Sequence, residues 1–209
     1  MKIVMATTNR GKVKELEAIL THDPAFADVE ILTLADAGIP GFDYEETADT
    51  FEGNAVGKAV AAAQAANLPA VADDSGLCVD SLGGEPGVYS ARWAGESATE
   101  AERNRLLLER LSGVPEADRT ARFVCVMAIA TPDGKLAAAE GTCDGIITSE
   151  SKGNSGFGYD PVFYVPNLGR TFAELSPVEK NMVSHRRAAI NNLAPRLYDI
   201  LASKPESVV

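Results

Sequence analysis

Two adjacent aspartates, Asp73 and Asp74, are the residues of this sequence with the most demanding chemistry. The apolar triplet 70–72 before them predicts a short buried strand, and Ser75-Gly76 follows them. Two carboxylates at the end of a buried strand need compensation, because burying an anion carries a large desolvation cost. A divalent cation supplies that compensation, and carboxylate oxygens suit Mg²⁺. Taken alone, the pair also fits a plain turn with a surface aspartate.

A polar helical face and an acidic loop lie upstream of the pair. Residues 50–66 are rich in alanine and predict a helix, on which Asn54 and Lys58 share one face because they are four residues apart. That face presents a donor amide and a cation, although decoration of an exposed helix is an equal alternative. The preceding loop contains Glu45 and Glu46, either of which can supply a further oxygen to a metal.

The N-terminal turn has the character of a phosphate-binding site. Residues 2–7 predict a buried strand, helical apolar spacing begins at Val13, and Asn9 is placed to cap that helix. Backbone N–H groups and the positive end of a helix dipole attract a phosphate at such a turn, and Lys12 adds a charge. The stretch is not a P-loop, because Val13 replaces the hydroxyl residue that would hold Mg²⁺. A capped helix start with a solvated lysine is the plainer interpretation.

Two further polar clusters lie towards the C-terminus. Glycines flank Phe157, so the backbone can approach a ligand closely while the ring offers a stacking face for a base. A β-turn without a ligand is the ordinary alternative. A capping box at Ser176 predicts a helix that continues to residue 201 and carries Lys180, His185 and Arg186. Such side chains suit carbonyl or phosphate oxygens, although basic residues on helices usually face water.

The remaining pattern predicts one mixed α/β domain over residues 1–209. Pro132-Asp133-Gly134 between two strand-like runs indicates an antiparallel hairpin. Strands and helices alternate elsewhere, without a repeat or a clear linker. The other predicted elements are strands at 29–34, 77–82, 146–148 and 162–165 and a helix at 99–111.

Composition and charge narrow the classes of partner. The chain has 209 residues and a net charge of −11, and 45% of its residues are hydrophobic, as in an ordinary globular protein. This acidic balance argues against binding a nucleic-acid polymer, which needs a basic surface. Three widely spaced cysteines predict buried free thiols, and no apolar run reaches the roughly 20 residues of a membrane helix. The first apolar run stops at Thr7, too early for a signal peptide, so we expect a cytoplasmic protein.

Taken together, these stretches resemble the inosine triphosphate pyrophosphatase family, in its bacterial form the dITP/XTP pyrophosphatases. The resemblance spans nearly the whole chain, with its motifs in order. The matching stretches are Ala6-Thr7-Thr8-Asn9-Arg10-Gly11-Lys12, Thr50-Phe51-Glu52-Gly53-Asn54-Ala55 with Lys58-Ala59, Ala72-Asp73-Asp74-Ser75-Gly76-Leu77, Pro86-Gly87-Val88-Tyr89-Ser90-Ala91-Arg92, Gly156-Phe157-Gly158-Tyr159-Asp160-Pro161, Phe172-Ala173-Glu174-Leu175-Ser176, Glu179-Lys180-Asn181 and Ser184-His185-Arg186. Thr8 stands where the family often has glycine.

The resemblance implies a fold, an assembly and a set of roles. It implies a long mixed β-sheet with flanking helices, two lobes around a nucleotide cleft, and a homodimer. It implies that Asp74 is the general base and a metal ligand, with Asp73 beside it and Glu46, or the adjacent Glu45, upstream. It further implies substrate contacts from Thr7, Thr8, Asn9, Arg10, Gly11, Lys12, Lys58, Ser75, Phe157, Gly158, Tyr159, Asp160, Lys180, His185 and Arg186.

The predicted reaction is hydrolysis of ITP, dITP or XTP to the monophosphate and pyrophosphate, with Mg²⁺ as cofactor. Asp74 would take the proton of a water that attacks the α-phosphorus. The base would stack on Phe157, while His185 and Arg186 would donate hydrogen bonds to a 6-oxo group. Two alternatives are a pyrophosphatase for modified pyrimidine or other nucleotides and a nucleotide-binding protein without catalysis. The retained Asp73-Asp74 pair argues against the second, because binding alone needs no base beside a metal.

Overall fold

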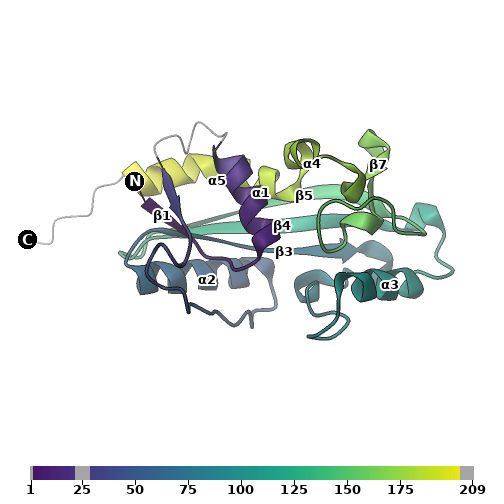
Figure 1. Ribbon diagram of the computed structural model, residues 1–209, viewed down its shortest axis with the longest axis horizontal. Helices are drawn as coiled ribbons and strands as arrows, with labels where there is room; N and C mark the ends of the chain where they lie inside the picture. Colours follow the sequence, from purple (N-terminus) through teal and green to yellow (C-terminus); the bar gives the residue numbers. More distant parts are fainter. Residues whose placement is uncertain (1, 22–28, 203–209) are drawn as a thin grey trace, which may run out of the picture. The chain divides into compact units, whose positions relative to one another are not determined.

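The structure is a computed structural model that describes residues 2–21 and 29–202 (Figure 1). The chain divides into two compact units. The first unit comprises Met1–Asp74, Cys125–Gly141 and Arg186–Val209, and the second comprises Ser75–Val124 and Thr142–His185.

One open, mixed sheet contains the seven strands of the described residues, in the order β2-β1-β3-β4-β5-β6-β7. Strand β1 pairs in parallel with β2 and β3, whereas β6 pairs antiparallel with β5 and β7. The predicted α/β class with a mixed sheet is therefore confirmed. The strand bounds are β1 Lys2–Met5, β2 Glu30–Leu32, β3 Ala70–Val79, β4 Thr120–Ala130, β5 Leu136–Ile147, β6 Phe163–Val165 and β7 Arg170–Thr171.

Helices cover both faces of the strands in the first unit, and strand alternation determines which residues meet which helix. On one face, Ala70 and Ala72 of β3 pack with the buried alanines of α2, Phe51–Ala66. On the opposite face, Val71 packs with Ile190 and other apolar residues of α5, His185–Ala202. Helix α1, Arg10–Thr21, contributes Val13 to this second cluster. Neighbouring residues of β3 therefore project towards different helices.

Helix α2 forms because its sequence favours both a helix and a close approach to the sheet. The Thr50 hydroxyl caps its first turn by accepting a hydrogen bond from the Gly53 N–H. Alanines at 55, 59, 62 and 63 are fully buried, and their small side chains bring the helix backbone close to the strands. The helix ends at Asn67, which adopts the left-handed conformation typical of a C-cap. Its predicted bounds are confirmed.

The second unit has an aromatic core. Phe123, Phe163 and Phe172 pack against one another, with ring centroids 4.6–5.7 Å apart. Helices α3, Glu100–Arg110, and α4, Pro177–Val183, begin with capping boxes at Thr99 and Ser176. Short 3-10 helices complete the unit at Asp80–Leu82, Gly87–Tyr89, Glu116–Asp118, Asp160–Val162, Pro166–Leu168 and Phe172–Glu174.

Three sequence predictions about element boundaries differ from the structure. The strand predicted separately at 146–148 is the end of β5. The strand predicted at 70–72, with residues 77–82 continuing it after a turn at the aspartates, runs through Asp73 and Asp74 without a break, so that β3 is one strand of ten residues. Aspartate, serine and glycine are poor strand formers, but here both carboxylates have polar partners that make their burial tolerable. The helix predicted from Ser176 to residue 201 is two helices, because Ser184 has an extended backbone (φ −72°, ψ 152°). Among the described helices, none is both long and apolar enough to cross a membrane.

Candidate active site

The N-terminal turn has the geometry predicted from the sequence. The Asn9 side chain caps α1 by accepting hydrogen bonds from the backbone N–H groups of Gly11 (2.9 Å) and Lys12 (3.2 Å). The Thr7 hydroxyl accepts a third, from the Asn9 N–H, at 3.2 Å. Thr8 is exposed, and the Arg10 side chain lies outside the described part of the chain. The turn thus presents the start of α1 with Lys12 on it, as a phosphate site requires.

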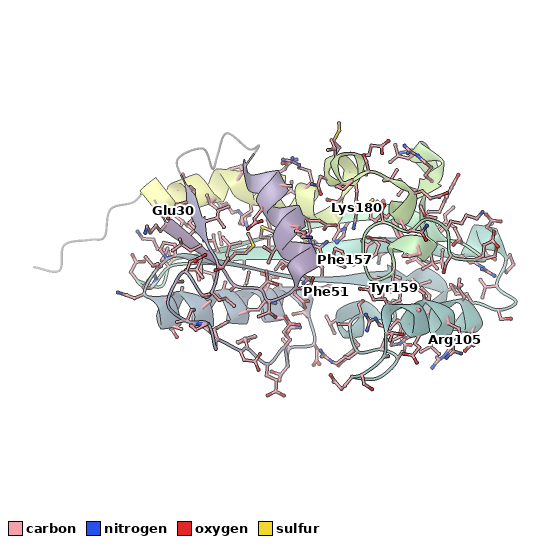
Figure 2. The ribbon with its side chains drawn as sticks, in the orientation of Figure 1. Glu30, Phe51, Arg105, Phe157, Tyr159 and Lys180 are labelled. Carbon is pink, nitrogen blue, oxygen red and sulfur yellow. The ribbon has the colours of Figure 1, made fainter. Side chains whose placement is uncertain are left out.

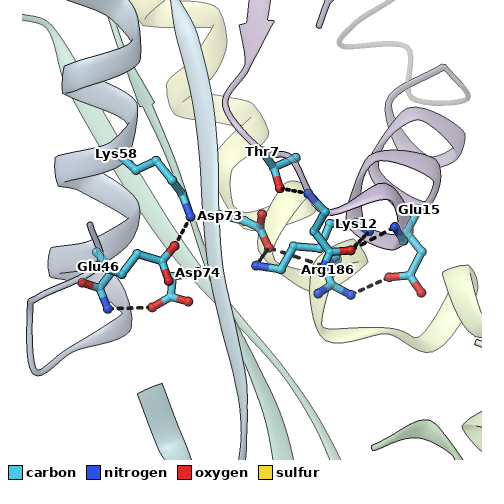
Figure 3. Close-up of polar contacts among 11 residues, drawn as sticks. Thr7, Lys12, Glu15, Glu46, Lys58, Asp73, Asp74 and Arg186 are labelled. Atoms are coloured by element: carbon cyan, nitrogen blue, oxygen red, sulfur yellow. Dashed lines mark hydrogen bonds and ion pairs between the residues drawn. The ribbon is translucent and has the colours of Figure 1, made fainter. Parts of the chain in front are cut away.

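Asp73 and Asp74 project to opposite faces of the sheet (Figure 3). Asp73 is completely buried, and its Oδ2 lies 3.0 Å from Lys12 Nζ and 3.5 Å from Arg186 Nε. Burial alone would raise the pKa of Asp73, but the charges of Lys12 and Arg186 outweigh it and hold the pKa well below its usual value. Asp73 is therefore an anion that forms ion pairs with two cations. The sequence predicted the pair as a single carboxylate site, and the continuous strand separates it.

Arg186 is held on the Asp73 side of the sheet by a second carboxylate. Its guanidinium is buried, and Nη1 donates to Glu15 Oε2 at 2.5 Å (Figure 3). The side chain therefore lies between α1 and β3. Sequence reasoning did not identify Glu15, although it follows Lys12 by three residues in α1 and so shares a helical face with it. The three-residue spacing from Lys12 is the signal from which Glu15 could have been predicted.

Asp74 faces α2, where its polar partners come from the predicted helical face. Asn54 Nδ2 donates to Asp74 Oδ2 at 3.0 Å. The Asn54 amide is itself fixed, because its Oδ1 accepts a hydrogen bond from the Ala48 N–H at 2.9 Å. Burial, and then the negative charge of Glu46, raises the pKa of Asp74. Asp74 is thus the more basic of the two aspartates.

Lys58 and Glu46 lie on this same side and bond directly to each other. Glu46 is half-buried, whereas Glu45 points into solvent. Burial would lower the pKa of Lys58, but the charges of Asp73 and Glu46 raise it, so the lysine remains a cation. Because Glu46 raises the pKa of Asp74, a cation between the two carboxylates would relieve their repulsion. The donor set of Glu46 and Asp74 therefore fits a hard divalent metal, and it is Glu46 rather than Glu45 whose charge acts on Asp74.

The described residues contain no group of three or more His, Cys, Asp or Glu side chains suited to hold a metal. A metal at Glu46 and Asp74 would therefore take its remaining oxygens from water or substrate, as Mg²⁺ bound with phosphates commonly does. Asp73, the third carboxylate predicted beside a metal, projects to the opposite face, where its Oδ2 lies close to Lys12 and Arg186.

In the second unit, Asp160 and Lys180 are buried polar residues beside the half-buried ring of Phe157. Figure 2 labels Phe157 and Lys180. Lys180 Nζ donates to Asp160 Oδ2 at 2.6 Å and lies 4.7 Å from the centre of the Phe157 ring. The same carboxylate oxygen accepts the Phe157 N–H at 2.8 Å. The ion pair therefore fixes both ends of the turn that presents Phe157.

The turn 156–160 depends on glycine at two positions. Gly156 has φ +78°, and a Cβ there would lie 2.0 Å from Asp160 Oδ2. Gly158 has φ +64°, in the left-handed region that favours glycine. Tyr159 is buried and its hydroxyl donates to the Ser90 carbonyl at 3.1 Å. We call residues 156–160 the aromatic turn.

His185 and Ser75 complete the predicted residues of the second unit. The His185 ring is buried and stacks on Phe123, with centroids 4.8 Å apart and planes 12° from parallel. Ser75 follows Asp74 in β3 and is half-buried. The structure therefore gathers the predicted residues into two sets. Thr7 to Lys12, Glu46, Lys58, Asp73, Asp74 and Arg186 belong to the first unit, and Ser75, Phe157 to Asp160, Lys180 and His185 to the second.

The protein belongs to the α/β class and is built on an open, mixed sheet. Its strand β3 carries two buried acids. Asp73 faces α1 and α5, and Asp74 faces α2. Residues 3–196 match the model of the Ham1 family, and the chain belongs to that family. A dITP/XTP pyrophosphatase from Desulforamulus reducens is 50% identical over 95% of this chain and 98% of its own length. One from Geobacillus kaustophilus is 48% identical over 97% of each.

Solved structures agree with this assignment. A Ham1 protein from Staphylococcus aureus has a TM-score of 0.83 and 44% identity, with coverage of 96% of this chain and all of that one. A dITP/XTP pyrophosphatase from Mycobacterium abscessus has a TM-score of 0.72 and 42% identity, covering 93% of this chain and all of its own.

Proposed function

We propose that this protein hydrolyses non-standard purine nucleoside triphosphates, such as ITP, dITP and XTP, to the monophosphate and pyrophosphate. The observation that carries the proposal is Asp74, a buried carboxylate of raised pKa that faces Glu46 and is oriented by the fixed amide of Asn54. A carboxylate of raised pKa is a stronger base than an ordinary aspartate, as a general base requires. The dITP/XTP pyrophosphatases among its relatives support the choice of substrate.

Glu46 and Asp74 are the residues that would hold Mg²⁺. Such an ion neutralises charge on the phosphates and lowers the pKa of a bound water. Asp74 accepts the proton of the attacking water, and Asn54 keeps its carboxylate in a single orientation. Lys58 and Lys12 supply positive charge to the phosphates, and each is held in place beforehand by a carboxylate, Glu46 or Asp73.

Base recognition belongs to the aromatic turn in this proposal. Phe157 stacks the purine, and the Asp160–Lys180 pair keeps its ring in place. His185 donates to a 6-oxo group, which an adenine cannot satisfy with its amino group. Arg186, predicted to act beside His185, is engaged with Glu15 and Asp73, so its first role is to hold the carboxylate and lysine beneath the phosphates.

The deciding assay incubates the protein with ITP, XTP, ATP and GTP, with and without Mg²⁺, and identifies the products. We expect monophosphate and pyrophosphate from ITP and XTP, with metal required. Release of orthophosphate alone, or equal turnover of ATP, would contradict the proposal. Turnover limited to modified pyrimidine nucleotides would show that the protein is a pyrophosphatase with a different substrate specificity. Tight binding without turnover would show that it is a nucleotide-binding protein without catalysis.

We further propose that the protein is a cytoplasmic homodimer. The dimer rests on the resemblance to pyrophosphatases of this type, and light scattering from purified protein measures it directly. The cytoplasmic assignment is supported by three free cysteines, Cys78, Cys125 and Cys143, which suit a reducing compartment. Fractionation of cells that produce the protein tests it.

A further inference from the structure

We infer that Asn104 on α3 is a positioning residue that holds the aromatic turn in the shape needed to bind a base. The inference rests on the proposed function, because it assumes that Phe157 stacks the purine. Asn104 lies 54 residues before Gly158 in the chain, and no sequence motif connects the two. Different contacts hold the ends and the middle of the turn.

The ends of the aromatic turn are fixed from inside the turn. Asp160 Oδ2 accepts the Phe157 N–H at 2.8 Å and also receives Lys180 at 2.6 Å. These bonds set the distance between the first and last parts of the turn. They leave the middle of the turn, Gly158 and Tyr159, without a constraint of its own, and glycine at φ +64° has wide conformational freedom.

Three hydrogen bonds from outside the turn reach its middle. One is local, from the Val162 N–H to the Tyr159 carbonyl at 3.1 Å, and two come from distant residues. Asn104 Nδ2 donates to the Gly158 carbonyl at 3.0 Å, and the Tyr159 hydroxyl donates to the Ser90 carbonyl at 3.1 Å. The Ser90 segment is itself held, because Ser90 Oγ donates to the Gly87 carbonyl at 2.6 Å and accepts the Leu77 N–H at 2.9 Å. Asn104 thus acts on the residue directly after Phe157.

The environment of Asn104 argues against a role in stability. The residue is only 6% exposed, and within the described part of the chain its buried Oδ1 has no hydrogen-bond partner. A buried amide that leaves its oxygen unsatisfied is destabilising relative to an apolar side chain of similar size. The apolar residues Leu107 and Leu111 occupy the neighbouring inward positions of α3 and its C-cap. The one bond to Gly158 is therefore what the asparagine adds.

The test compares Asn104→Leu and Asn104→Asp with a control on the exposed side of the same helix. Leucine keeps most of the volume and removes the donor, and aspartate keeps the shape but places an acceptor against the Gly158 carbonyl. Glu109→Gln is the control, because the Glu109 side chain is exposed and pairs with the exposed Arg105 one turn earlier in α3. For each protein, kcat and KM are measured with ITP. The inhibition constant of Mg²⁺-tripolyphosphate, which has no base, is measured alongside.

We expect KM for ITP to rise about tenfold in both Asn104 variants, which is the effect of one lost hydrogen bond of the stronger kind. The kcat and the inhibition constant of tripolyphosphate should stay within about twofold of wild type, because the phosphate site is untouched. Hydrogen exchange of the 156–160 peptide should become faster, and Glu109→Gln should match wild type throughout.

The outcomes separate the inference from the function it rests on. If wild type does not hydrolyse ITP, the proposed function fails, and faster exchange at 156–160 in the variants still decides whether Asn104 holds the turn. If wild type is active, an unchanged KM in either folded variant overturns the inference. A parallel loss of ITP and tripolyphosphate binding also overturns it, since that result indicates general distortion. Should Asn104→Leu not fold, Asn104→Asp carries the same comparison.

Discussion

Asp73 and Asp74 are neighbours in the chain, and their surroundings move their pKa values in opposite directions. Two cations stabilise the charged form of Asp73, whereas burial and Glu46 destabilise the charged form of Asp74. When the pKa values of two neighbouring acids are shifted in opposite directions, the acids can have different roles. Here Asp73 is a permanent anion and Asp74 is the proton acceptor. The two residues should therefore respond differently to the same substitution.

Asp74→Asn should remove activity and leave stability nearly unchanged. Asparagine keeps the shape and can still accept the hydrogen bond from Asn54, and a buried carboxylate of raised pKa gives up little on becoming neutral. We expect kcat for ITP to fall by about 10²–10⁴, the usual contribution of a general base. Steady-state kinetics and urea unfolding measure the two effects. Near-normal turnover would remove Asp74 from its role.

Asp73→Asn should instead lower stability strongly, because it leaves the half-buried Lys12 without its carboxylate and the buried Arg186 with Glu15 alone. We expect a loss of about 3–5 kcal/mol in the free energy of unfolding at pH 7, the usual effect of breaking a buried ion pair. Asp73 has a folded pKa below its unfolded value, so its stabilisation is present above the unfolded pKa and is lost as pH falls towards the folded one. Urea unfolding from pH 7 to pH 3 should show a difference that narrows below about pH 4. A constant difference contradicts the pairing.

Sequence reasoning reached most of these residues but not their arrangement. It identified the aspartates, Lys12 and Lys58 by residue type, and it identified Asn54 by helical spacing. It predicted a turn at residues 73–76 between two strand segments, so the alternation that separates the two carboxylates could not be applied. To predict that the two carboxylates project to opposite faces, one has to know that β3 lies between β1 and β4 in the sheet. Glu15 could have been found by spacing, whereas Asn104 could not, because its contact is non-local.

At the scale of elements, capped helices and tight turns were predictable because their signals are local. The bounds of α2 and α3 and the capping box of α4 follow from a few adjacent residues. The continuity of β3 and the break at Ser184 do not, since each depends on partners distant in the chain. The contact between α2 and the loop that carries Glu46 is another feature that local sequence does not predict, and a substitution at Gly57 in α2 tests it.

Gly57→Ala should impair the metal site although alanine favours a helix by about 1 kcal/mol over glycine. A Cβ at this position would lie 1.9 Å from the hydroxyl oxygen of Tyr44, whose ring therefore has to move. Tyr44 precedes Glu46 by two residues in the same loop, so we expect Glu46 to be displaced with it. The Mg²⁺ concentration for half-maximal activity should rise at least about tenfold.

Gly41→Ala is the matched control for that substitution. It lies in the loop that leads to Glu46, and a Cβ there would have nothing within 4 Å. A metal titration of this variant should overlay that of wild type. Equal Mg²⁺ requirements in Gly57→Ala and Gly41→Ala would show that the loop tolerates the alanine and that Glu46 is positioned independently of Tyr44.

At the scale of the whole molecule, an acidic protein is expected to handle a highly charged anionic substrate. With 30 acidic and 19 basic residues the net charge is −11, which repels any polyanion at long range. The candidate cations described in each unit are already paired: Lys12 and Arg186 with Asp73 and Lys58 with Glu46 in the first unit, and Lys180 with Asp160 in the second. A short triphosphate needs only a few such groups and a metal, whereas a nucleic-acid strand needs a continuous basic surface.

Single-stranded DNA should therefore fail to compete with ITP. A 20-nucleotide strand, added at a phosphate concentration equal to that of an inhibitory dose of tripolyphosphate, should leave the rate of ITP hydrolysis unchanged at low salt. The low ionic strength matters, because screening is weakest there and both repulsion and any basic patch have their largest effect. Inhibition by the strand that weakens steeply as salt is raised would reveal such a patch, since counterion release gives binding to a polyanion that dependence. In that case net charge would be a poor guide to the partners of this protein, and the distribution of its basic residues would decide them.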